Sequence, residues 1–136
     1  MHSSPSSAQA IVVCAAIIVR QQQVLVTLRP RDKRLGGYWE FPGGKLEPGE
    51  SRHEALHREL REELDIAIHI DRHLATVTYE YDWGIARIEG YLCRLKSGTI
   101  RHLEVADHAW VAIDQLDRYR LLPADQPFIG KLKELS

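Results

Sequence analysis

A capped helix carrying three clustered glutamates is the feature that most restricts what this chain can be. Ser51 and Glu54 have the S-x-x-E spacing of a capping box, which predicts a helix over residues 52–64. Leucines recur every four residues along this segment, at Leu56, Leu60 and Leu64. This spacing predicts one apolar face, so the helix is expected to pack against the core of a larger fold.

Three carboxylates of this helix lie close to its apolar face. Glu59, Glu62 and Glu63 stand at positions i, i+3 and i+4. With about 100° of rotation per residue, Glu63 lies about 20° and Glu59 about 60° from Leu56. Like charges beside a buried face repel each other unless a cation compensates them, and clustered carboxylates suit Mg2+ or Mn2+. Spacing alone leaves a second interpretation open, namely a solvated acidic face balanced by Arg58 and Arg61.

The loop before the helix strengthens the metal interpretation. Gly43 and Gly44 allow a backbone carbonyl group to approach a cation without obstruction by a side chain. Loop and helix together resemble the signature of the Nudix hydrolase family, G-x5-E-x7-R-E-U-x-E-E-x-G-U, where U is aliphatic. The matching residues are Gly44, Glu50, Arg58, Glu59, Leu60, Glu62, Glu63 and Ile66. Asp65 departs from the family glycine, but aspartate tolerates a left-handed conformation after a helix, so we expect the metal site to be unharmed.

The resemblance implies an α/β fold, an α/β/α sandwich with a mixed β-sheet, over a single domain of residues 10–136. The metal ligands that it implies are Glu59, Glu62, Glu63 and the carbonyl group of Gly43. Gly44, Glu50 and Arg58 would have structural roles: Glu50 and Arg58 orient the loop and the helix, or else form a plain salt bridge.

A wider similarity, over nearly all of residues 11–135, is to the MutT branch of this family. It includes the run LRPRDKRLGGYWEFPGGKLEPGE. It implies that Arg29 contacts substrate phosphate and that Glu104 is an additional metal-binding or water-orienting acid. Without the resemblance, both are ordinary loop residues.

Three further residues are candidates for contact with the nucleotide base. Asp125 lies in LLPADQPFI, which resembles a segment whose polar residue contacts the edge of the base. An aspartate there accepts from N–H groups of the base or, when protonated, donates to it. It also stands where it would cap the last helix. Trp39 and Phe41 line either the base pocket or the core.

The resemblance implies Mg2+-dependent hydrolysis of a modified or oxidised nucleoside triphosphate to a monophosphate and pyrophosphate. Glu59 is the first choice for the base that deprotonates the attacking water, with Glu62, Glu63 and Glu104 as rivals. Oxidised guanine and cytosine nucleotides both suit an acidic pocket. One alternative is a pyrophosphatase for another nucleotide such as ADP-ribose. Tyr81 lies near the position where resemblance to such branches would place a proline or a tyrosine. Another is a non-catalytic binding module, against which the complete glutamate cluster argues.

Apolar patterning predicts a sheet around this helix and a second helix at the end of the chain. Strands are expected at residues 11–19, 24–28, 38–41, 66–70, 74–81, 85–95 and 109–113, and the second helix at 124–135. The first two strands are expected to form a hairpin at the edge of the sheet. The sequence Pro42-Gly43-Gly44 is expected to end the third.

Composition excludes several other classes of protein. A net charge of −1 without a basic stripe argues against binding to long nucleic acids and leaves a small nucleotide as the partner. Residues 11–19 are too few to span a bilayer and residues 1–9 are expected to be disordered, so no membrane partner and a cytoplasmic location are predicted. Cys14 and Cys93 are predicted to be reduced core thiols. A monomer and a homodimer both remain open.

Overall fold

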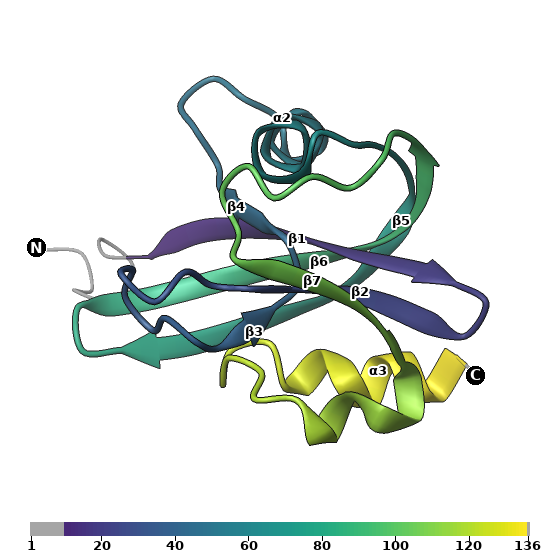
Figure 1. Ribbon diagram of the computed structural model, residues 1–136. Helices are drawn as coiled ribbons and strands as arrows, with labels where there is room; N and C mark the ends of the chain where they lie inside the picture. The colour runs from purple at the N-terminus through teal and green to yellow at the C-terminus, as the bar shows by residue number, and fades with distance from the viewer. Residues whose placement is uncertain (1–9, 136) are drawn as a thin grey trace, which may run out of the picture.

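The computed structural model describes residues 10–135, which form a mixed β-sheet between helical layers (Figure 1). The strands are β1 (Ile11–Arg20), β2 (Gln23–Leu28), β3 (Trp39–Glu40), β4 (Gly43–Lys45), β5 (Ala67–Tyr81), β6 (Gly84–Ser97) and β7 (Asp107–Ala112). The helices are α2 (Arg52–Leu64), the 3-10 helix η1 (Ile113–Arg118) and α3 (Pro127–Leu135). The predicted disorder of residues 1–9 lies outside the described residues.

Strand β1 occupies the centre of the sheet. It runs parallel to β6, from the pair Ile11 and Ala86 to the pair Ile18 and Cys93, and antiparallel to β2 and β4. The path through the sheet is β3-β2-β1-β6-β5, with β7 on β2. The expected hairpin of β1 and β2 exists, but its predicted place at the sheet edge is wrong. Residues 14–18 are buried without interruption, as in a strand that is covered on both faces.

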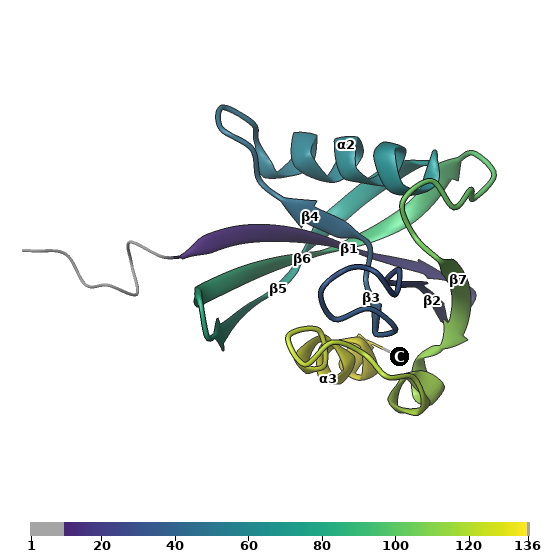
Figure 2. The same cartoon turned by 60° about the vertical axis from the view of Figure 1, so that its left-hand side comes forward.

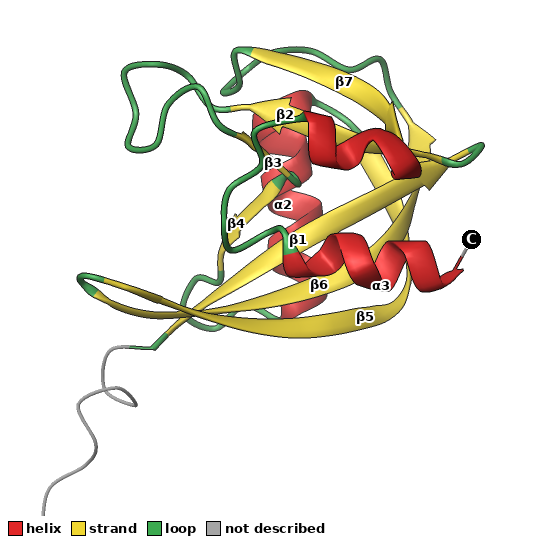
Figure 3. Cartoon of the chain, turned by 90° about the horizontal axis from the view of Figure 1, so that it is seen from below, coloured by secondary structure: helices red, strands yellow, loops and turns green. Residues whose placement is uncertain are grey.

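Helices cover both faces of the sheet, which confirms the predicted α/β/α sandwich (Figure 2). Helix α2 packs Leu56, Leu60 and Leu64 into a core on one face. On the other face, Phe128 and Leu132 of α3 pack into a second core together with η1. Figure 3 shows α3 lying along β5 and β6.

The ends of α2 follow local sequence as predicted. The Ser51 hydroxyl accepts from the Glu54 backbone N–H, and the Glu54 carboxylate accepts from the Ser51 backbone N–H, so the capping box is confirmed. Asp65 ends the helix in the left-handed conformation, with φ 58° and ψ 42°. Its backbone N–H donates to the carbonyl group of Arg61 at 3.0 Å. A residue other than glycine therefore completes this turn.

Several element boundaries differ from the prediction. The two strands expected at 66–70 and 74–81 are one strand, β5, whose pairing with β6 shifts at irregularities between Ile70 and Arg72 and between His73 and Ala75. Gly43 and Gly44 do not merely end a strand, because they form β4. Helix α3 begins at Pro127, three residues later than expected.

Both cysteines are buried free thiols, as predicted. Cys14 and Cys93 are fully inaccessible to solvent. Burial raises the pKa of Cys14 to about 11 and that of Cys93 to about 12. Both thiols therefore stay protonated and unreactive near neutral pH. None of the helices within residues 10–135 is both long and apolar enough to cross a membrane.

Candidate active site

Strand β4 brings the glycine loop under α2. Gly43 pairs with Ala15 and Gly44 with Cys14 of the central strand β1. Gly43 has a φ of 150°, and a β-carbon there would collide with the backbone oxygen of Cys14. Only glycine fits this position, because the backbone conformation and the close approach of two strands both exclude a side chain.

Gly44 makes room for a carboxylate of α2. A β-carbon at Gly44 would meet the carboxyl group of Glu59 rather than backbone. The Glu59 side chain is only 16% exposed and lies over this glycine. Gly44 therefore determines where the Glu59 carboxylate sits, a role that the sequence alone did not reveal.

We expect Gly44→Ala to lower turnover without unfolding the protein. The methyl group would displace the flexible end of Glu59, so the stability cost should stay below about 1 kcal/mol. A shift of about 1 Å at a reacting group can cost up to about 100-fold, and we expect at least about a 10-fold loss of kcat. Thermal unfolding and kcat measured on the same preparation check this. Unchanged kcat would show that the position of Glu59 does not matter.

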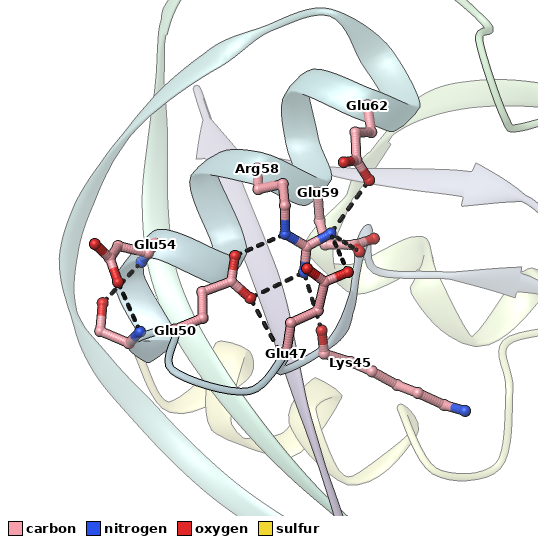
Figure 4. Close-up of polar contacts among 8 residues, drawn as sticks. Lys45, Glu47, Glu50, Glu54, Arg58, Glu59 and Glu62 are labelled. Carbon is pink, nitrogen blue, oxygen red and sulfur yellow. Dashed lines mark hydrogen bonds and ion pairs between the residues drawn. The ribbon is translucent and has the colours of Figure 1, made fainter.

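Arg58 connects the loop to the helix (Figure 4). Its guanidinium group donates to both carboxylate oxygens of Glu50, at 2.7 and 3.0 Å, and to the backbone oxygen of Lys45 at 3.1 Å. It also donates to Glu59 at 2.7 Å and to Glu62 at 3.2 Å. These bonds raise the pKa of Arg58, with Glu50 as the largest cause. Arg58 therefore does not form only a simple salt bridge with Glu50, because it also holds the loop and two carboxylates of α2.

Glu63 lies in a concentration of negative charge. Loss of solvation raises the pKa of its carboxyl group well above the usual range, and Glu59, Glu40 and Glu104 raise this pKa further. The loop that carries Glu104 is held at the end of α2, since the backbone N–H groups of Leu103 and Glu104 donate to the carbonyl oxygen of Glu63. Glu104, some forty residues later in the sequence, is therefore brought close to Glu59 and Glu63.

The composition of this cluster fits a divalent cation. Within residues 10–135, Glu63 and Glu104 form no ion pair with a basic side chain, whereas Arg58 already binds Glu59 and Glu62. A cation from solution would offset the repulsion that raises the pKa of Glu63. Oxygen donors on a mostly rigid helix are the ligands that Mg2+ prefers, together with water and phosphate.

A cavity of about 480 Å3 lies next to β4 and the start of β1. Its lining includes Ile11, Val13, Arg29, Arg34, Leu35, Lys45, Tyr81, Trp83, Ala86, Ile88, Leu122, Ala124 and Asp125. Arg29 contacts both carboxylate oxygens of Glu40 at 3.2 Å. Glu40 raises the pKa of both Glu63 and Asp125, so its carboxylate is close to the acidic cluster as well as to the cavity. Nothing in the sequence singled out Glu40, because it is a lone acid among the aromatic residues of a short strand.

Asp125 is the buried polar residue of the cavity wall. Its side chain accepts a hydrogen bond from the backbone N–H of Phe41 at 3.1 Å and does not cap α3, so that alternative is wrong. Burial, together with the negative charge of Glu40, raises the pKa of Asp125 to about 8. Asp125 is therefore largely protonated near neutral pH, with an O–H group available to donate.

This raised pKa predicts a pH-dependent difference between the wild type and Asp125→Asn. The folded state binds the Asp125 proton more tightly than the unfolded state, whose pKa is near 3.8. The stability that this provides is complete below about pH 4 and is lost as pH rises to about 8. The melting temperature of the wild type should therefore fall relative to that of Asp125→Asn across this range. A constant difference would mean that Asp125 has an ordinary pKa.

The two aromatic candidates belong to the core rather than to the cavity wall. Trp39 packs edge-on against Tyr119, and Phe41 is buried edge-on against Phe128. Both side chains pack against the core beneath α3, which favours the core interpretation of the two that the sequence left open. The cavity instead has Tyr81 and Trp83, whose rings are stacked 5.2 Å apart at an angle of 9°. Tyr81 ends β5 and Trp83 lies in the turn that follows, and nothing in the sequence indicated that their rings stack.

Comparisons with known proteins agree with this geometry. A family model described as NUDIX domain matches residues 13–131. CTP pyrophosphohydrolase of Escherichia coli strain K12 is 37% identical over 119 residues, which cover 88% of each chain. The 8-oxo-dGTP diphosphatase of the same strain is 30% identical over 120 residues, covering 87% of this chain and 93% of the relative. A crystal structure of a MutT NUDIX hydrolase from Burkholderia pseudomallei is 29% identical, has a TM-score of 0.82, and covers 94% of this chain and 99% of that one.

Proposed function

Because the chain belongs to the Nudix hydrolase family, we propose that it hydrolyses a nucleoside triphosphate to a nucleoside monophosphate and pyrophosphate. The observation that carries the proposal is the acidic cluster of α2 beside a cavity that contains a protonated Asp125. The preferred substrates are modified or oxidised triphosphates, in line with relatives named for CTP and 8-oxo-dGTP. This activity would remove damaged nucleotides from the cellular pool.

The acidic cluster would hold Mg2+, with Mn2+ as a substitute. The proposed ligands are Glu59, Glu62, Glu63, Glu104 and the carbonyl group of Gly43. When bound, the cation supplies positive charge that neutralises the polyphosphate and favours ionisation of the attacking water. Glu62 is exposed and bonded to Arg58, so its carboxylate must leave this contact to join the others.

The protein's own residues position the reactants. Glu59 is the proposed base that takes the proton of the attacking water, because Gly44 and Arg58 together hold its carboxylate in place. Arg58 and Glu50 are positioning residues that keep the loop aligned with the helix. Arg29 would exchange its contact with Glu40 for a substrate phosphate, for which a guanidinium group is well suited. Most of the rate enhancement in such reactions comes from positioning and charge stabilisation.

The cavity would hold the nucleoside. A base would stack beside the paired rings of Tyr81 and Trp83, since stacking tolerates any base. A protonated Asp125 offers a donor next to an acceptor, which matches a base edge that carries an acceptor next to a donor. Cytosine has this pattern at N3 and N4, and 8-oxoguanine has it at O6 and N7. Unmodified guanine presents two acceptors in the major groove.

Turnover with Mg2+ on a panel of 8-oxo-dGTP, dGTP, CTP, 5-methyl-dCTP and ADP-ribose tests this proposal. We expect a triphosphate with a donor-acceptor edge to have the highest kcat/KM and 8-oxo-dGTP to exceed dGTP. Cleavage of ADP-ribose alone would keep the metal site and reject the substrate class. No turnover of any compound would reject the proposal.

A further inference from the structure

Two histidines and an aspartate gather at the surface beside the loop that carries Glu104. The ligand atoms of His102, Asp107 and His108 all lie within 4.8 Å of one another. Nε2 of His102 is 2.8 Å from Nδ1 of His108 and 3.8 Å from a carboxylate oxygen of Asp107. We infer that these three residues form a second metal site, which binds Zn2+.

The backbone presents these ligands in a nearly assembled arrangement. Asp107 and His108 lie on β7, paired with Leu28 and Thr27 of β2. On the other side, the neighbours of His102 are anchored to α2, because Arg101 N–H donates to the Leu64 oxygen at 2.9 Å and Leu103 N–H to the Glu63 oxygen at 3.0 Å. Little chain ordering therefore has to accompany binding, which favours affinity.

The orientation of the Asp107 carboxylate is also supported. One of its oxygens accepts a hydrogen bond from the backbone N–H of His108 at 2.8 Å. Hydrogen bonds of this kind fix metal ligands and contribute to affinity. Asp107 is exposed, as is His102, so neither side chain serves the core and both are open to a cation.

The donor atoms select Zn2+ over Mg2+. Two imidazole nitrogens and one carboxylate oxygen, with water in the fourth position, form a familiar tetrahedral Zn2+ site, whereas Mg2+ prefers oxygen ligands. Zn–N bonds of about 2.0–2.1 Å place the two nitrogens roughly 3.3 Å apart, so the rings would separate only slightly from their present contact. The acidic cluster and this site would therefore bind different cations.

A cation here would join the two ends of the Glu104 loop. His102 precedes Glu104 by two residues, and Asp107 follows it by three. Binding would restrain residues 103–106 and slow amide hydrogen exchange there. The site itself does not depend on the proposed hydrolytic activity, because its ligands are separate from the α2 carboxylates.

Zn2+ titration calorimetry in excess Mg2+ tests the inference on the full chain. Excess Mg2+ occupies the acidic cluster, so the wild type should bind one additional Zn2+. We expect His102→Ala and His108→Ala each to weaken this binding by about 10- to 100-fold or more. His69→Ala is the matched control, since His69 is exposed on β5 at the opposite edge of the sheet.

Two outcomes would overturn the site. One is the absence of additional Zn2+ binding by the wild type, and the other is equal Zn2+ affinity in all four proteins. The variants His108→Asn and Asp107→Asn keep polar side chains of similar size and guard against loss of folding, which circular dichroism monitors. Zn2+-dependent protection of residues 103–106 from hydrogen exchange, lost in His108→Asn, would support the joining of the loop ends. This result does not require any turnover.

Discussion

Replacing Glu63 with glutamine is expected to lower Mg2+-dependent turnover by about 10²–10³-fold, the loss typical of one preorganised electrostatic contact. Glu63 sits among Glu59, Glu40 and Glu104 and forms no ion pair with a basic side chain in residues 10–135. The amide keeps the size of the side chain but loses the charge that would bind the cation. Steady-state kinetics at saturating nucleotide and varied Mg2+ measure the effect.

The same substitution should not destabilise the metal-free protein. The raised pKa of Glu63 shows that its charged form is costly in the fold, and the neutral amide removes this cost. Mg2+ should raise the melting temperature of the wild type but not that of Glu63→Gln. Glu54→Gln is the matched control on the same helix, because glutamine also completes a capping box. Full Mg2+-dependent turnover by Glu63→Gln would reject α2 as the metal platform.

Replacing Asp125 with alanine is expected to reduce kcat/KM for every base, and about 10- to 100-fold more for the preferred base than for the others. This extra loss is the effect expected from losing one or two hydrogen bonds to the base. Asp125 is 6% exposed, and its carboxyl group is the buried acid that lines the nucleoside cavity. Comparing kcat/KM for each triphosphate of the panel between the two proteins measures the loss of selectivity.

Asp125→Asn separates recognition from structure. Alanine also leaves the backbone N–H of Phe41 without its acceptor, which lowers stability whatever the substrate. Asparagine keeps an acceptor for this group but changes the donor available to the base. Equal losses for all bases in both variants would show that Asp125 only supports Phe41.

Local features of this fold were predictable from sequence, whereas long-range pairing was not. The capping box at Ser51 and the left-handed Asp65 depend on a few neighbouring residues, and both were confirmed. The central place of β1 depends on its pairing with β6, more than seventy residues away, which the pattern of one strand does not encode. The uninterrupted apolar run of residues 14–18 was the available signal for a central strand, which is buried on both faces.

The candidate site shows the same division. The α2 carboxylates are spaced by helix geometry, so their grouping followed from sequence. Glu40 joins them only because β3 pairs with β2, where Glu40 lies opposite Thr27. Trp39 and Phe41 are adjacent to the site in sequence, yet their rings pack into the core.

The identity of the products tests whether this chain hydrolyses a nucleoside triphosphate to a monophosphate and pyrophosphate. The preferred triphosphate of the panel would be incubated with the enzyme and Mg2+, and the products followed by phosphorus-31 NMR. Glu63→Gln would serve as the blank for contaminating phosphatases. We expect nucleoside monophosphate and pyrophosphate in equal amounts, formed by the wild type and nearly absent with the variant. Nucleoside diphosphate with orthophosphate, or equal product from both proteins, would contradict it.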